Sequence, residues 1–121
     1  MTNSSLCSGR VAVKKPWGKF EQYTHNVPCT TKIITVKPGG KLSCQYHHNR
    51  DELWVVLDPD AQVEIGDEVL YPEPEEEVFM PRGTVHRLSC YGDRPARILK
   101  ISFGEFDEND IVRLEDVYGR E

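Results

Sequence analysis

Two short segments of the sequence carry residue types that bind divalent metal ions. The first contains Gln45, His47 and Glu52, and the second places His86 three residues after Gly83 in a Pro-x-Gly-x-x-His string. Side chains two apart on a β-strand project to the same face, so Gln45 and His47 can point to one place. Two imidazoles, a carboxylate and an amide oxygen suit Zn, Mn, Fe, Co or Ni, with positions left for water or substrate.

The chemistry that such a site offers is polarisation of a substrate oxygen. A bound divalent ion acts as a Lewis acid on a carbonyl or hydroxyl group. A closed structural zinc site would instead use cysteines, but the four cysteines show no paired C-x-x-C spacing; they are Cys7, Cys29, Cys44 and Cys90. We expect these thiols to be reduced, with Cys44 facing away from the metal.

The elements that position these residues are expected to be short strands. Runs of β-prone residues alternate with turns that contain Gly or Pro, a pattern typical of an all-β sandwich or barrel. The predicted strands span residues 31–37, 42–47, 53–57, 61–65, 68–71, 78–80, 85–90 and 96–103. Trp17 and Trp54 are predicted to lie in the core.

The last residues show a different pattern. Ile111, Leu114 and Tyr118 recur at helical spacing, and Asp107 stands where a helix cap would. We therefore predict a short C-terminal helical segment. Arg113 within it is expected to pair with neighbouring acids.

The apolar residues of the 53–57 strand suggest contacts on both of its faces. Every residue there is apolar, whereas a strand with one wet face would alternate. The outward face is expected to be covered by an arm from the first thirty residues or by a second subunit, which favours a homodimer. We predict a polar tail at residues 1–10 and one domain over residues 11–121.

Bulk properties exclude several classes of protein. The 121 residues fit one domain, and the net charge of −5 with no basic stripe argues against a nucleic-acid partner. No stretch has the apolar length of a membrane span, and the polar N-terminus does not resemble a signal peptide. We expect a cytoplasmic protein with no membrane partner.

Several strings that run in order along the chain carry a family resemblance. They are Lys15-Pro16-Trp17-Gly18-Lys19-Phe20, Lys37-Pro38-Gly39, Gln45-x-His47-His48-x-Arg50-x-Glu52-x-Trp54, Pro81-x-Gly83-x2-His86-Arg87-Leu88 and Asp110-Ile111-Val112-Arg113 with Tyr118-Gly119-Arg120. These resemble the paired motifs of the cupin superfamily, and more narrowly the C-terminal isomerase domain of type II phosphomannose isomerases. The resemblance implies a double-stranded β-helix, or jelly-roll barrel. It begins near Val11 and lacks the guanylyltransferase domain that often precedes this domain, so we expect no nucleotide transfer.

The resemblance also implies a reaction and a ligand set. Gln45, His47, Glu52 and His86 would hold the metal, and the domain would interconvert mannose 6-phosphate and fructose 6-phosphate. This isomerisation moves a proton between C2 and C1, usually through an enediol. The metal would stabilise the developing oxyanion, and a positioned base would take the proton.

Arg50, Arg82 and Lys100 are the residues expected to meet the substrate. Arg50 offers a planar fork of donors to a phosphate or enediolate, and Arg50 and Lys100 are the predicted catalytic residues. Lys100 and Ser102 stand where the family often carries Glu and Gln. Lys100 therefore reverses a charge at a position predicted to face the barrel lumen.

Two other functions are consistent with the sequence. Lys100 and Cys90 depart from the family pattern, which permits a non-catalytic cupin that binds a sugar phosphate or another metabolite. A cupin dioxygenase is a further alternative, but such enzymes usually place histidines at three ligand positions, and Gln45 occupies one of them.

Overall fold

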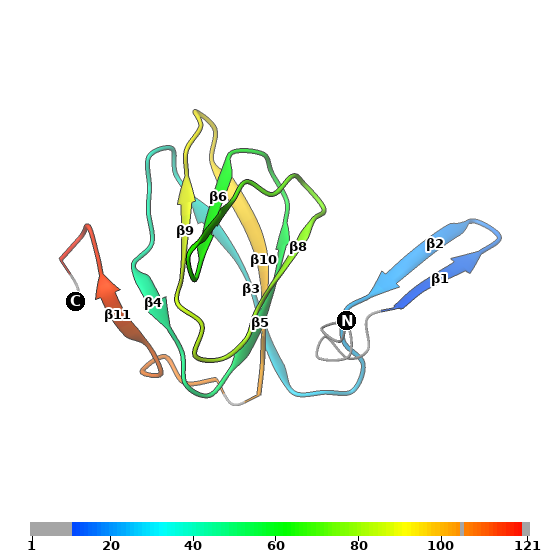
Figure 1. Ribbon diagram of the computed structural model, residues 1–121. Coiled ribbons are helices and arrows are strands. Elements are labelled where there is room, and N and C mark those ends of the chain that lie inside the picture. The colour runs from blue at the N-terminus through cyan, green and yellow to red at the C-terminus, as the bar shows by residue number, and fades with distance from the viewer. Residues whose placement is uncertain (1–10, 105, 120–121) are drawn as a thin grey trace.

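The structure, a computed structural model, describes residues 11–104 and 106–119, and all of their regular secondary structure is β-strand (Figure 1). The strands are β1 (Val11–Lys15), β2 (Gly18–Gln22), β3 (Cys29–Val36), β4 (Cys44–Tyr46), β5 (Asp51–Val56), β6 (Ala61–Ile65), β7 (Glu68–Leu70), β8 (Glu77–Met80), β9 (His86–Cys90), β10 (Ala96–Phe103) and β11 (Val112–Glu115). All eight strands predicted between residues 31 and 103 are present, with ends shifted by a few residues. The prediction for residues 1–10 lies outside the described residues.

Two sheets form the barrel. One has the order β3-β10-β5-β8 and the other the order β11-β4-β9-β6-β7, with antiparallel pairing throughout. The sheets face each other across a common interior (Figure 1). This arrangement confirms the all-β jelly-roll prediction. Because neighbouring strands come from distant parts of the chain, the barrel brings the two metal-ligand segments together.

The core fills one part of the space between the sheets. Trp54, Val56, Leu88 and Ile98 are almost completely buried there, together with Val63. Alternation along each strand separates this interior from the outer face, because successive side chains point in opposite directions. Trp54 lies in the core as predicted.

The outer face of the four-stranded sheet carries a second apolar cluster. Leu53 and Val55 of β5 are buried on this face with Ile101 of β10, and Tyr23 packs against them. Both faces of β5 are therefore covered, as its uniform apolar sequence predicts. Tyr23 follows β2, so part of the cover comes from the N-terminal arm.

The arm itself is a hairpin of β1 and β2 that extends away from the barrel (Figure 1). Trp17 lies in its turn and is 72% exposed, so the prediction that Trp17 belongs to the core is wrong. The turn lies at the far end of a hairpin that projects from the barrel, so the barrel interior is out of reach of the Trp17 side chain.

The prediction of a C-terminal helical segment is also wrong. Residues 112–115 form β11, which pairs with β4 through Val112 and Arg113. Leu114 and Tyr118, two of the residues at helical spacing, are exposed. The backbone of β4 offers a sheet edge to this segment, and pairing with that edge outweighs the local helical pattern. No helix among the described residues is long and apolar enough to cross a membrane.

Candidate metal centre and active site

Four predicted ligand positions converge inside the barrel. One nitrogen of His47, one nitrogen of His86 and one carboxylate oxygen of Glu52 all lie within 4.8 Å of one another. Glu52 lies on β5 and His86 on β9, while His47 directly follows β4. Gln45 of β4 is the strand partner of His86, so its side chain enters the same cavity.

Each imidazole is oriented by a backbone carbonyl. The Nδ1–H of His47 donates to the carbonyl of Asp110 at 2.7 Å, and the Nδ1–H of His86 donates to the carbonyl of Thr84 at 2.9 Å. A carbonyl only accepts, so Nδ1 carries the proton and Nε2 is the electron-pair donor of each ring. His47 Nε2 accepts from Arg50 Nη2 at 3.3 Å, whereas His86 Nε2 has no hydrogen-bond partner among the described residues. Burial lowers the pKa of both histidines and favours this neutral form.

Two atoms of the cluster are buried and unsatisfied. Within the described part of the chain, Gln45 Oε1 and His86 Nε2 have no hydrogen-bond partner. Such atoms are costly unless something binds them. Both are electron-pair donors, as a metal ligand must be, and they flank a buried carboxylate. The donor set of Gln45, His47, Glu52 and His86 therefore fits a divalent cation, although its role as the ligand set stays a prediction.

Glu52 is the anion at the centre of a cationic neighbourhood. Arg50 Nε donates to its Oε2 at 2.9 Å and Trp54 Nε1 donates to its Oε1 at 2.9 Å. Lys100 Nζ lies 3.7 Å from Oε2. Burial alone would raise the pKa of Glu52, but Lys100, Trp54 and Arg50 outweigh it and hold that pKa below its usual range. The carboxylate is thus kept ionised and ready to bind a cation.

Asp110 fixes the loop that carries His47. Its carboxylate accepts the backbone N–H groups of His48 and Asn49, each at 2.9 Å, while its carbonyl accepts His47 Nδ1–H. The hydrogen bond from His48 N–H, followed by that from Asn49 N–H, lowers the pKa of Asp110. Asp110, which precedes β11, therefore sets both the backbone and the ring orientation at His47.

The cavity around the cluster is small and rich in cationic groups. Its volume is about 140 Å³. The charged residues that line it, besides the two histidines, are Lys32, Arg50, Lys100 and Arg113 against Glu52 and Glu108. Lys32 pairs with Glu108 at 3.1 Å, and Phe106 lies 4.4 Å from both the Lys32 and Arg50 cations. The surplus of positive charge suits an anionic ligand.

Arg113 is a site residue that the sequence interpretation missed. It lines the cavity, and its Nε is buried without a hydrogen-bond partner among the described residues. The helical interpretation of residues 111–118 assigned Arg113 to neighbouring acids instead. In β11 it is paired with Gln45, and this register brings it to the metal cluster. Its place in the Asp110-Ile111-Val112-Arg113 string was the one available signal.

Arg50 and Lys100 lie in the cavity, whereas Arg82 does not line it. Arg50 lies in the loop before β5 and is only 5% exposed. Burial lowers the pKa of Lys100, even though Glu52 opposes that shift. Arg82 is exposed and contacts Asp51, which accepts its backbone N–H at 2.7 Å. Substrate binding by Arg82 stays a prediction. His48, which directly follows His47, is exposed.

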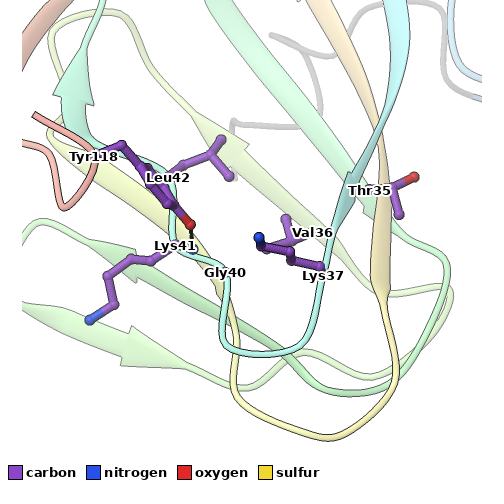
Figure 2. A pocket seen from close by; sticks show the side chains of 7 residues that line it. All are labelled: Thr35, Val36, Lys37, Gly40, Lys41, Leu42 and Tyr118. Carbon is purple, nitrogen blue, oxygen red and sulfur yellow. Dashed lines mark hydrogen bonds between the residues drawn. The ribbon is translucent and has the colours of Figure 1, made fainter. Parts of the chain in front are cut away.

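A larger cavity of about 550 Å³ lies beside the connection between β3 and β4 (Figure 2). Lys37 and Tyr118 face each other across it, and the Tyr118 hydroxyl accepts the backbone N–H of Lys41 at 3.4 Å. No imidazole or carboxylate lines it in the described part of the chain. Size alone does not make it the reactive site, because the groups that can perform chemistry lie in the smaller cavity.

A family comparison agrees with this geometry. The model of the family described as mannose-6-phosphate isomerase C-terminal matches residues 2–116. The chain belongs to this family. The match includes every residue of the metal cluster and Arg113. The family comparison and the sequence motifs therefore point to the same mannose-6-phosphate isomerase C-terminal family.

Curated relatives of this mannose-6-phosphate isomerase C-terminal domain are bacterial biosynthetic proteins. The chain is 41% identical over 109 residues to the xanthan biosynthesis protein XanB of Xanthomonas campestris pv. campestris. It is 40% identical to the alginate biosynthesis protein AlgA of Pseudomonas aeruginosa and to the mannose-1-phosphate guanylyltransferase ManC of Salmonella typhimurium. Each alignment covers 89% of this chain but only 23% of the relative, so the chain spans about a quarter of their length.

Solved structures agree with the fold. The capsular polysaccharide assembling protein CapF of Staphylococcus aureus superposes with a TM-score of 0.65 and 21% identity, over 88% of this chain and 34% of that one. A double-stranded β-helix protein of Klebsiella pneumoniae superposes with a TM-score of 0.64 and 16% identity, over 88% and 84%. The fold of this domain is therefore the cupin fold.

Proposed function

We propose that this domain is a metal-dependent aldose-ketose isomerase that interconverts mannose 6-phosphate and fructose 6-phosphate. The observation that carries the proposal is the placement of Gln45, His47, Glu52 and His86 in one cavity with surplus cationic side chains. The four candidate ligands suit a cation that binds sugar oxygens, and the cationic side chains suit a phosphate. Membership of the isomerase family supports the same reaction.

Phosphate recognition falls to the guanidinium of Arg113. Arg113 lines the cavity, and its buried Nε has no hydrogen-bond partner among the described residues, so the guanidinium has donor capacity left for a phosphate oxygen. Arg50 is less free to do so, because its Nε is already bound to Glu52. Arg113 is therefore a stronger candidate for the phosphate than Arg82, which is outside the cavity lining.

The reaction requires proton transfer between two adjacent carbons. Starting from the aldose, a base removes the C2 proton and the C1 oxygen gains a proton, which gives an enediol. The proton is then returned to C1 while the C2 hydroxyl loses its proton, so that atoms balance and no redox partner is needed. When bound, the divalent ion would supply Lewis-acid polarisation of a sugar oxygen.

Lys100 is our candidate for the group that carries the proton. It lines the cavity, and its amine lies 3.7 Å from a carboxylate oxygen of Glu52. Arg50 Nη2 lies 3.3 Å from His47 Nε2, so its guanidinium can balance negative charge that develops on the substrate oxygens near the cluster.

The cytoplasm, where sugar phosphates occur, is the compartment that this function requires.

The decisive experiment is turnover of mannose 6-phosphate by the purified chain with each common divalent metal, in an assay that detects fructose 6-phosphate. We expect turnover, with solvent deuterium entering fructose 6-phosphate at C1. The Lys100→Met variant should lose turnover and deuterium exchange while it still binds metal. Exchange at the wild-type rate in that variant would assign the base elsewhere.

A second candidate function is non-catalytic binding of a sugar phosphate. Lys100 favours it, because its charge reverses the family's usual acid at this position and forms an ion pair with the central carboxylate at 3.7 Å. Calorimetry that shows saturable binding of mannose 6-phosphate without turnover under any metal would support this function over the isomerase.

A further inference from the structure

The β1–β2 hairpin carries exposed apolar side chains. Its two strands form a sheet of their own, and Figure 1 shows them extending away from the barrel. An isolated two-stranded hairpin is at best marginally stable in water, because one hydrogen-bonded pair buries little apolar surface. This hairpin therefore needs a surface on which to pack.

Its two faces differ in chemistry. The register pairs Val13 with Phe20, and Val11 lies two residues from Val13 on the same side. Val11 is 45% exposed and Phe20 is 40% exposed. The opposite side carries Lys14 and Lys19, which are paired across the strands. Lys15 lies on the same side as Val13, and its ammonium is 6.0 Å from the centre of the Phe20 ring. The hairpin thus presents one largely apolar face that ends in a lysine, with Lys14 and Lys19 on the other face.

A groove of matching character lies on the outer face of the four-stranded sheet. Its volume is about 540 Å³, and its apolar lining comes from Tyr23, Val55, Leu57 and Leu99. Glu75 lines it from the β7–β8 connection, and Glu21 lines it from β2 of the chain's own hairpin. Leu99 of β10 is paired with Ile33 of β3, the edge strand of this sheet. Ile33 therefore extends the apolar surface toward the sheet edge.

Charge favours the same pairing of surfaces. Residues 11–22 carry three lysines and one glutamate, a net charge of +2, whereas residues 73–77 carry four glutamates. Glu73, Glu75 and Glu76 are exposed beside the groove. A basic hairpin is attracted to this acidic rim, and the attraction decreases with ionic strength.

We propose that two copies of this chain form a dimer in which each hairpin packs, apolar face down, into the groove of the other copy. Tyr23, at the base of the hairpin, itself lines the groove. A two-fold axis near this point lets both hairpins exchange at once, as a symmetric interface requires. The exchange packs Val11, Val13 and Phe20 against the apolar side chains of the partner's groove.

The test is the mass in solution, measured by light scattering and sedimentation over a range of concentrations. We expect the full chain to be a dimer whose dissociation constant rises with salt. Phe20→Asp on the hairpin and Leu99→Asp in the groove should each raise that constant by about thirtyfold or more. Val69→Asp, at an exposed position on β7, is the matched control and should leave the dimer intact.

Mixing the two damaged chains gives the sharpest readout. Each is monomeric alone, but together the intact hairpin of one fits the intact groove of the other, so a heterodimer should form. If Leu99→Asp fails to fold by circular dichroism, the surface variant Glu73→Lys/Glu75→Lys/Glu76→Lys replaces it. A monomeric wild-type chain, a dimer that survives both changes, or the absence of any heterodimer would overturn the proposal.

Discussion

At the scale of single residues, the site depends on which nitrogen of each histidine points inward. The backbone carbonyls of Asp110 and Thr84 hold the Nδ1–H groups, so both Nε2 atoms are directed to the same carboxylate. His47 Nε2 lies 3.5 Å from Glu52 Oε2, and His86 Nε2 lies 4.0 Å from Oε1. Donor atoms this close to one another can bind a single cation together.

Replacing a ligand histidine should remove metal binding without unfolding the barrel. We expect His47→Ala or His86→Ala to abolish stoichiometric uptake of zinc or cobalt, measured by elemental analysis and cobalt absorption. His48→Ala is the control, because the adjacent imidazole is exposed and stacks edge-on against Tyr46. Unchanged metal content in both ligand variants would contradict the assignment.

The side chain of Asp110 positions the first histidine. Asp110→Ala removes the acceptor for two backbone N–H groups, and we expect a loss of about 1.5–3 kcal/mol in unfolding free energy, measured by urea denaturation. Metal affinity should fall as well, because the His47 loop is no longer fixed. Asp110→Asn should recover part of both losses. Asp93→Ala, at an exposed position, should change stability by less than about 0.5 kcal/mol.

At the scale of elements, β11 brings Arg113 to the cavity. Strand pairing with β4 places this guanidinium opposite Gln45 rather than on a solvated helix. We expect Arg113→Gln to raise the KM for mannose 6-phosphate, or its Kd if turnover is absent, by roughly 10- to 150-fold, with metal binding unchanged. Arg94→Gln, in the exposed turn before β10, should leave these constants unaltered. An equal loss for both variants would indicate a general charge effect.

At the scale of the whole molecule, stability should fall as the solution becomes acidic. The pKa values of His47, His86, Glu52 and Asp110 are all lowered in the folded protein. The unfolded chain therefore binds protons first, at about pH 6.5 for the histidines and about 4 for the carboxyl groups. Each group contributes stability above its unfolded pKa and loses it as the pH falls toward its folded pKa.

Urea titrations of the chelator-treated protein between pH 8 and pH 3 measure this dependence. Two declines in unfolding free energy are expected, one starting near pH 6.5 and one below about pH 4.5. The His47→Gln/His86→Gln double variant should lose the first decline and keep the second. A flat profile from pH 7 to pH 5 in the wild-type protein would show that the histidines do not titrate as proposed.

The sequence by itself predicted the strands and most of the residues that meet in the small cavity. Short apolar runs separated by Gly and Pro predict strands, because backbone turn chemistry and side-chain alternation are local properties. Gln45 and His47 share a face for the same reason, and the structure places both inward. The family strings then connected this segment with His86, which no local rule could have done.

Only the tertiary structure decided the roles of residues whose environment comes from distant segments. Residues 111–118 carry a helical pattern, yet the free edge of β4 draws residues 112–115 into a strand and Arg113 into the cavity. Arg50 lies in a loop but is buried because Glu52 and Phe106 meet it there. Trp17 is apolar but exposed, because its hairpin leaves the barrel. Burial and pairing depend on contacts that the local sequence does not contain.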